Sequence, residues 1–303
     1  MLAAVVLAAG GCAAAPAGPE PISEVAIVDR EPVGERGHDL TVGSPSLGRT
    51  APVRVLLPRG WTPGSGPWPV LYLLHGCCGR THLGWAEEGG AERLTADLRA
   101  IVVIPDGGRV GFYSDWLRGP KWETFHIEEL VPLIEKEFGA GPRRAVAGLS
   151  MGGHGAMAYA ARHPGMFQAA ASYSGVLDTT DDRSGVRGLA VDNGEDPEAL
   201  WGDPISDKKV WQAHNPTALA GRLKGVRLYV SSGDGDPGPL DPPGTRADYE
   251  GVLLHQSEAF AEAAKAAGID VTTDFYGDGT HTFPYWERAL ERSLPMMRAA
   301  IGA

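Results

Sequence analysis

The clearest candidate for chemistry is a serine between glycines, in the segment Gly148-Leu149-Ser150-Met151-Gly152. An apolar run at residues 144–149 predicts a strand before it, and a small-residue segment at residues 151–163 predicts a helix after it. Gly-x-Ser-x-Gly between a strand and a helix is typical of a nucleophile elbow, a sharp turn that exposes the serine hydroxyl. Side chains in place of the outer glycines would collide across that turn. We therefore expect Ser150 to be a nucleophile; a structural serine in a tight glycine turn is the alternative.

A nucleophilic serine needs N–H donors for the oxyanion that develops on its substrate. The backbone N–H of Met151, at the N-terminus of the predicted helix, is the first candidate. The second is the backbone N–H of Cys77, which lies in a glycine-rich loop after the predicted strand at residues 69–75. His75 and Cys78 flank this donor and are candidates for substrate contact. Cys77 as the nucleophile is a weaker alternative, because it has no elbow context.

The serine also needs a base and an acid. His281 follows the predicted strand at residues 271–276 and precedes the last predicted helix, which is the expected place for the base. Asp234 follows the predicted strand at residues 226–231, the usual place for the acid. Glu250, at the start of the next predicted helix, is a second candidate. These positions alone favour Asp234.

Strands alternating with helices position these residues. The alternation predicts one α/β domain with a mostly parallel central sheet flanked by helices. Because a parallel sheet gathers its active residues at the carboxyl ends of its strands, the loops after residues 75, 149, 231 and 276 should meet. We expect strands at 41–57 (one or two), 69–75, 100–105, 144–149, 169–173, 226–231 and 271–276, and helices at 91–98, 122–138, 151–163, 249–267 and 284–301.

Composition and motifs argue against nucleic-acid binding and against a metal or cofactor. The 303 residues carry 27 Lys and Arg against 38 Asp and Glu, a net charge of −11, which argues against a nucleic-acid binder. The nine histidines show no ligand spacing on one helix, so we expect no metal, and no motif suggests a cofactor.

Residues 1–19 resemble a secretory leader and linker before a single domain at residues 20–303. Residues 1–18 carry no charge, and their apolar stretch is too short to span a membrane. The segment ending at Cys12 also resembles a lipoprotein signal, which predicts membrane attachment through a lipidated Cys12; a plain leader is the alternative. Either interpretation predicts a secreted or cell-envelope protein.

Two further cysteines, Cys77 and Cys78, are adjacent. Neighbouring Cα atoms are about 3.8 Å apart, shorter than the usual disulfide span. We therefore expect two small apolar residues packed in a turn. A vicinal disulfide is the alternative in an oxidising compartment.

From about residue 69 to residue 286, the sequence resembles the mycolyltransferases of the antigen 85 type, in the esterase-D-like branch of the α/β-hydrolases. The matching pieces are Phe112-Tyr113-Ser114-Asp115-Trp116, Lys121-Trp122-Glu123-Thr124-Phe125, Gly148-Leu149-Ser150-Met151 and His281-Thr282-Phe283-Pro284-Tyr285-Trp286.

The resemblance implies an α/β-hydrolase fold and acyl-ester chemistry. The family places its acid as a Glu in a Glu-Gly context at the start of the helix before the last strand, which Glu250-Gly251 matches. The preferred acid therefore becomes Glu250, with Asp234 as the alternative. Trp286 is expected near His281 and the substrate, from their proximity in the chain.

One departure from the family concerns its sugar-binding loop. Where the family has Asp-Gly-Leu-Arg, this chain has His75-Gly76-Cys77-Cys78. The oxyanion donor needs only a backbone N–H, but a thiol cannot replace a bidentate arginine contact. Trehalose is therefore not assured as the acyl acceptor.

Three functions from different classes follow. The first is a serine acyltransferase that passes an acyl group to a sugar or lipid hydroxyl. The second is a secreted carboxylesterase with water as the acceptor. An S-formylglutathione hydrolase shares the Ser-Met-Gly-Gly-His stretch but would be cytosolic, which the leader opposes. The third is a non-catalytic surface binding protein on a hydrolase scaffold, which the retained candidates Ser150 and His281 disfavour.

Overall fold

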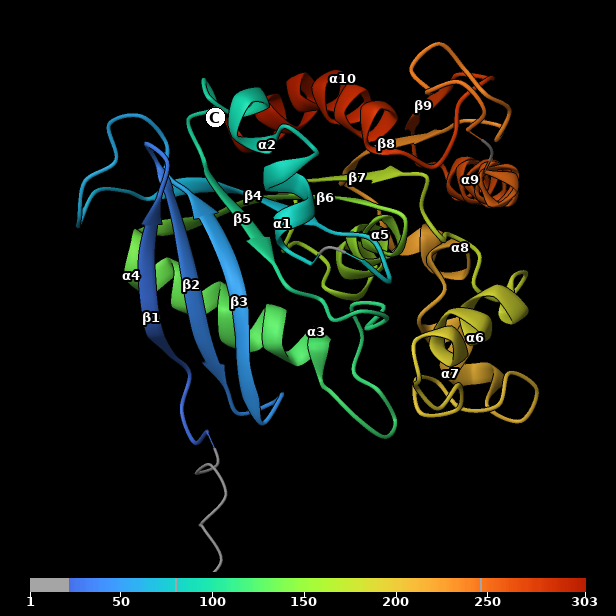
Figure 1. The fold of residues 1–303 in the computed structure, drawn as a ribbon, viewed down its shortest axis with the longest axis horizontal. Coiled ribbons are helices and arrows are strands. Elements are labelled where there is room, and N and C mark those ends of the chain that lie inside the picture. Colours follow the sequence, from blue (N-terminus) through green and yellow to red (C-terminus); the bar gives the residue numbers. More distant parts are fainter. Residues whose placement is uncertain (1–21, 80, 246) are drawn as a thin grey trace, which may run out of the picture.

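The fold is organised around one mixed sheet (Figure 1). The computed structural model describes residues 22–79, 81–245 and 247–303, so the predicted leader and Cys12 lie outside this part. Within it, nine strands pair in the order β1-β2-β3-β5-β4-β6-β7-β8-β9. They are β1 (Ala26–Val33), β2 (Gly37–Ser44), β3 (Arg49–Leu56), β4 (Trp68–Leu74), β5 (Ile101–Pro105), β6 (Ala140–Leu149), β7 (Ala169–Tyr173), β8 (Arg227–Ser232) and β9 (Val271–Phe275).

The sheet is mostly parallel, as expected. Strands β5, β4, β6, β7, β8 and β9 are parallel to one another. The pairs β1–β2, β2–β3 and β3–β5 are antiparallel. The region at residues 41–57 proves to be the two strands β2 and β3. The edge strand β1 was not anticipated, because its polar, largely exposed residues carry little apolar pattern.

Helices cover both faces of the sheet (Figure 1). One face packs against α1, α2 and α10, and the other against α4, α5 and α9. The helices are α1 (Leu83–Glu87), α2 (Ala91–Leu94), α3 (Trp122–Thr124), α4 (Val131–Phe138), α5 (Met151–Arg162), α6 (Arg183–Asp192), α7 (Lys208–Ala213), α8 (Pro216–Leu219), α9 (Asp248–Ala266) and α10 (Phe283–Ile301).

Strand β4 illustrates why the central strands are continuous apolar runs. Its residues Val70, Tyr72 and Leu74 join the core on one face, while Leu71 and Leu73 join the core on the other. Successive side chains of a strand point to opposite faces, so a strand covered by helices on both sides must be apolar throughout.

The predicted helix at residues 122–138 is present, with α3 and α4 joined by a π-helical segment, Phe125–Leu130. Glu123 at its start accepts hydrogen bonds from Arg162 Nε at 2.8 Å and from His163 Nε2 at 2.7 Å. Burial alone would raise the pKa of Glu123, but these partners lower it to about 2. The Lys121–Phe125 motif of the resemblance therefore ties this helix to the end of α5, the helix that begins after Ser150.

The largest differences from expectation lie between β7 and β8. Helices α6, α7 and α8 occupy this region, for which the sequence pattern predicted no helix or strand. The predicted helix at residues 91–98 is also shorter, because only α2 is helical there. No helix in the described part of the chain is both long and apolar enough to cross a membrane.

Candidate active site

Ser150 lies at a sharp turn between β6 and α5. Its backbone has φ +53° and ψ −120°, a conformation that non-glycine residues rarely adopt. A Cβ on Gly148 would lie 2.2 Å from the Gly152 carbonyl oxygen, and a Cβ on Gly152 would lie 2.3 Å from the Leu74 carbonyl oxygen. The two glycines are therefore required by close backbone approach, as a nucleophile elbow demands.

Glu250 and His281 form a hydrogen-bonded pair of a buried carboxyl group and a partly exposed imidazole. His281 Nδ1 lies 2.6 Å from Glu250 Oε2, although the residues are 31 positions apart in the sequence. The first turn of α9 carries Glu250, which is fully buried, and the loop between β9 and α10 carries His281. In a neutral imidazole whose Nδ1–H donates to the carboxylate, Nε2 carries no proton and can accept one.

The second oxygen of Glu250 accepts three hydrogen bonds. Ser174 Oγ donates at 2.6 Å, Ser232 Oγ at 2.9 Å and the Gly233 backbone N–H at 3.1 Å. Burial acts to raise the pKa of Glu250. The hydrogen bond and the charge of His281 oppose this effect, as do the hydrogen bonds from Ser174 and Ser232, and the pKa is lowered overall. Glu250 is therefore held as a carboxylate, which can orient an imidazole and stabilise its protonated form.

Sequence reasoning missed Ser174, which links the acid to an aromatic wall of the site. Its backbone φ is +48°, and its hydroxyl accepts a hydrogen bond from Trp286 Nε1 at 3.0 Å. The Trp286 ring lies edge-on to His281, with 4.7 Å between ring centroids. The expected proximity of Trp286 to His281 is therefore observed. The sequence signal for Ser174 was the Ser-x-Ser pattern Ser172-Tyr173-Ser174 at the end of β7.

We expect Ser174→Ala to lower kcat for ester hydrolysis about tenfold, because a lost hydrogen bond to a charged group costs about 1.5–3 kcal/mol. KM should stay within about twofold, since Ser174 acts through Glu250 rather than on substrate. Steady-state kinetics on a nitrophenyl ester measure both constants. The control is Ser184→Ala, which removes an exposed hydroxyl from α6 and should leave kcat within about twofold. An unchanged kcat in Ser174→Ala would show that Glu250 does not need this donor.

Asp234, the alternative acid, lies elsewhere. Its Oδ1 accepts a hydrogen bond from the Asp236 backbone N–H, and its carboxylate groups with those of Asp236 and Asp278. Within the described residues, no hydrogen bond or ion pair joins Asp234 to His281. The structure thus brings Glu250, and not Asp234, to the histidine.

Ser150 and His281 line the same open pocket of about 590 Å³. Its walls are mostly apolar, and Glu88 adds a carboxylate to them. The pocket walls come from the loops after β4, β6 and β9, from α6, from the loop before α9, and from the end of α1 and the starts of α9 and α10. The remaining lining residues are Gly76, Cys77, Gly79, Leu149, Leu189, Pro242, Tyr249, Thr282, Phe283, Pro284 and Trp286.

The two candidate oxyanion donors lie beside Ser150. Met151 begins α5 directly after the serine, and Cys77 lines the pocket. Neither backbone N–H has a hydrogen-bond acceptor among the residues that the structure describes. Both are therefore available to a substrate oxygen.

Two expectations about the loop after β4 need correction. His75 is 3% exposed and outside the pocket lining; its Nε2 accepts from the Gly107 N–H at 2.8 Å, and its Nδ1 donates to the Gly76 carbonyl at 2.6 Å. Direct substrate contact by His75 does not fit this position. Cys78 is likewise absent from the lining, and Cys77 and Cys78 form a disulfide rather than two free thiols. The alternative of a vicinal disulfide is therefore the one observed, with a left-handed backbone at Cys78, φ +68°.

Comparisons with known proteins agree with this geometry. Residues 44–297 match the family model described as "Putative esterase". The diacylglycerol acyltransferase/mycolyltransferase Ag85B of Mycobacterium intracellulare is 31% identical over 277 residues, covering 86% of this chain and 82% of that protein. Esterase Rv1288 of Mycobacterium tuberculosis is 34% identical over 256 residues, covering 80% of this chain and 55% of that protein.

Among solved structures, Mycobacterium tuberculosis MPT51 superposes with a TM-score of 0.75 at 28% identity, covering 88% of this chain and all of that one. The expected resemblance to the antigen 85 type and the expected α/β-hydrolase fold are confirmed by these matches. The relatives support an acyltransferase or esterase function.

Proposed function

The chain belongs to the esterase family, and on that premise we propose that it is a serine-dependent acyl-ester enzyme that works through an acyl-Ser150 intermediate. The observation that carries the proposal is the Glu250–His281 pair, 2.6 Å apart, whose histidine lines one pocket with Ser150. A serine on a strained turn, a histidine and a carboxylate are the parts that acyl transfer requires.

In the acylation step, Ser150 Oγ attacks the ester carbonyl carbon while His281 Nε2 takes the hydroxyl proton. Glu250 stabilises the imidazolium through Nδ1–H. The backbone N–H groups of Met151 and Cys77 donate to the oxyanion of the tetrahedral intermediate. The intermediate then breaks its bond to the alkoxy oxygen, which leaves as an alcohol with the proton from His281.

In the deacylation step, an acceptor O–H attacks the acyl-Ser150 carbonyl and gives its proton to His281. The second tetrahedral intermediate uses the same two N–H donors. When it collapses, the bond between the acyl carbon and Ser150 Oγ breaks, and His281 returns the proton to Ser150. Water as the acceptor releases a free acid, whereas a sugar or lipid hydroxyl gives a new ester.

Water is the acceptor we favour, and transfer to a hydroxyl is the second candidate. The positions at which the family grips its sugar hold a buried His75 and a disulfide-bonded Cys78, neither of which can supply a carboxylate or a guanidinium. The mostly apolar pocket suits the acyl part of an ester. The observation that supports transfer as the second candidate is the 31% identity to a mycolyltransferase over most of the chain.

We further propose that the enzyme acts outside the cytoplasm, secreted or attached to the cell envelope. The uncharged leader at residues 1–18 supports export, and Cys12 supports membrane attachment through a lipid. Both features lie outside the described residues.

The fate of the acyl group tests the choice of acceptor. The domain is mixed with a medium-chain nitrophenyl ester and excess trehalose, and the products are analysed by mass. We expect nitrophenol with free acid. Acyl-trehalose as the main product would instead establish transfer, with other residues holding the sugar. Absence of nitrophenol release would overturn the enzyme proposal and favour a binding protein.

A further inference from the structure

We propose that the Cys77–Cys78 disulfide is a redox-controlled modification site that holds the oxyanion loop in its active shape, so that a dithiol reductant lowers turnover. This inference rests on the proposed function, because Cys77 supplies one of the two proposed oxyanion donors. The bond joins the adjacent residues at the point where the loop after β4 reaches the pocket.

On its N-terminal side, the loop is pressed against the nucleophile. A Cβ on Gly76 would lie 2.6 Å from Leu149 Cδ1 and 3.3 Å from Ser150 Cβ. The buried His75 ring holds the same stretch through the Gly107 N–H. The position of the backbone up to Gly76 is therefore set by packing and does not depend on the sulfurs.

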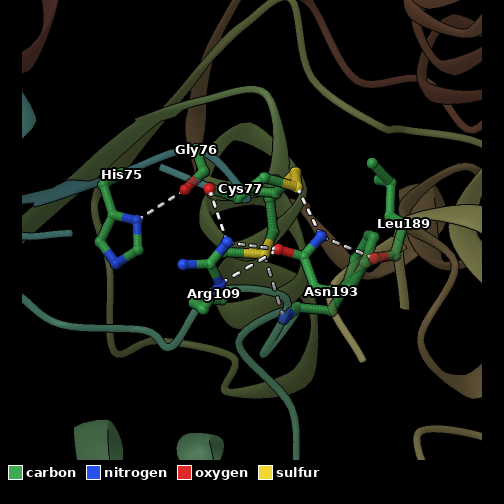
Figure 2. Close-up of a disulfide and its surroundings, with 9 residues drawn as sticks. His75, Gly76, Cys77, Arg109, Leu189 and Asn193 are labelled. Atoms are coloured by element: carbon green, nitrogen blue, oxygen red, sulfur yellow. Dashed lines mark hydrogen bonds between the residues drawn. A yellow bond between two sulfur atoms is a disulfide. The ribbon is translucent and has the colours of Figure 1, made fainter. Parts of the chain in front are cut away.

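On its C-terminal side, the loop is held by a polar network around Arg109 and Asn193 (Figure 2). The Cys78 N–H donates to the Arg109 carbonyl at 2.7 Å, and Arg109 Nη2 donates to the Cys78 carbonyl at 3.3 Å. Asn193 Oδ1 accepts from Arg109 Nε and Nη2, and its Nδ2 donates to Cys78 Sγ at 3.2 Å and to the Leu189 carbonyl at 2.8 Å. Through this network, the sulfur is linked to α6, whose Leu189 lines the pocket.

Between these two anchors, the disulfide restricts the backbone. Because the bonded residues are neighbours, the ring that they close contains the Cα–C bond of Cys77 and the N–Cα bond of Cys78. Rotation about both bonds is limited, and Cys78 is kept at φ +68°, which non-glycine residues disfavour. When the ring opens, the disulfide no longer limits these two rotations, and only the hydrogen bonds to Arg109 hold Cys78. The backbone between the two anchors then relaxes, and the Cys77 N–H moves relative to Ser150.

The site is accessible to reductants. Both cysteines are half-buried, and Cys77 faces the open pocket. A thiolate of an external dithiol attacks one sulfur, the S–S bond breaks, and a mixed disulfide forms. The second thiol of the reagent then displaces the protein sulfur. Two electrons and two protons pass to the protein, which carries two thiols, and the reagent leaves as a cyclic disulfide.

The experiment compares kcat and KM for a nitrophenyl ester before reduction with dithiothreitol, after reduction, and after reoxidation. It uses the full chain with Cys12→Ser, so that Cys77 and Cys78 are the sole thiols. We expect kcat to fall at least about tenfold and to recover, with KM within about twofold, because an oxyanion donor acts on the transition state. Complete loss of one such donor costs roughly 10²–10³-fold in kcat.

The matched variant replaces Cys77 and Cys78 by serine in the same Cys12→Ser background. We expect its kcat to be low from the start and unaffected by dithiothreitol. Counting thiols by alkylation and mass, in the unfolded state, should find none before reduction and two after it. Circular dichroism before and after reduction reports whether the fold persists.

The possible outcomes distinguish failure of the redox role from failure of the proposed function. Turnover that stays unchanged while two thiols appear would overturn the redox role and leave the proposed function intact. Free thiols in the protein as isolated, with full activity, would do the same. An oxidised enzyme no more active than Ser150→Ala would overturn the proposed function, and the redox role with it.

Discussion

Replacing Ser150 by alanine is expected to lower kcat/KM for ester hydrolysis by at least about 10⁴-fold, because the acyl-enzyme route disappears with its nucleophile. In a serine protease, loss of the nucleophile alone costs about as much as loss of the whole triad, roughly 10⁶-fold in kcat. Alanine removes the hydroxyl and leaves the Cβ of this strained turn in place, so the melting temperature should not fall. Initial rates with a nitrophenyl ester and a thermal melt measure the two effects.

The matched control is Ser184→Ala, which removes an exposed hydroxyl from α6. This variant should keep the rate of the unmodified enzyme within about twofold. If Ser150→Ala retained more than a tenth of that rate, the nucleophile would have to be another group, and the Cys77 thiol after reduction would be the next candidate.

Replacing Glu250 by glutamine should lower kcat about 10⁴-fold, the cost of the equivalent acid-to-amide change in the serine proteases. Glu250 accepts from His281 through one oxygen and from three donors through the other. An amide has a single oxygen, so its NH₂ must face either His281 or that set of donors. Facing His281, it forces the proton onto Nε2, and the histidine is no longer a base.

Asp234→Asn is the matched control, because it makes the same chemical change at the alternative acid. Its effect on kcat should stay within about threefold, since Asp234 contacts its own loop instead of His281. Both variants are compared at neutral pH, where Glu250 is ionised because its hydrogen-bonded partners lower its pKa. The opposite ranking of the two variants would return the acid to Asp234.

What the sequence predicted well was local. The nucleophile elbow depends on a strand, a turn and a helix that are contiguous in the chain, so Ser150 could be placed from pattern alone. The buried strands were visible for the same reason, because two covered faces demand an unbroken apolar run. His281 followed from its place after the last strand.

The sequence could not predict contacts between residues that are far apart in the chain and meet only when it folds. Position alone favoured Asp234, because the first turn of α9 approaches His281 only in the folded chain; the family resemblance supplied Glu250. Ser174 and Ser232 reach the same carboxylate from two different strand ends. His75 was a candidate for substrate contact because it lies close to Cys77 in the chain. Its ring is instead buried, and its Nε2 accepts a hydrogen bond from the Gly107 N–H.

The most direct test of the proposed mechanism is the mass of the acyl-enzyme. The protein is mixed with a nitrophenyl ester, quenched in acid within the first turnover, digested and analysed by mass spectrometry. We expect one added acyl group on the peptide that contains Ser150, and none in Ser150→Ala. Rapid nitrophenol release with no adduct on that peptide, or with the adduct on another residue, would contradict the acyl-Ser150 route.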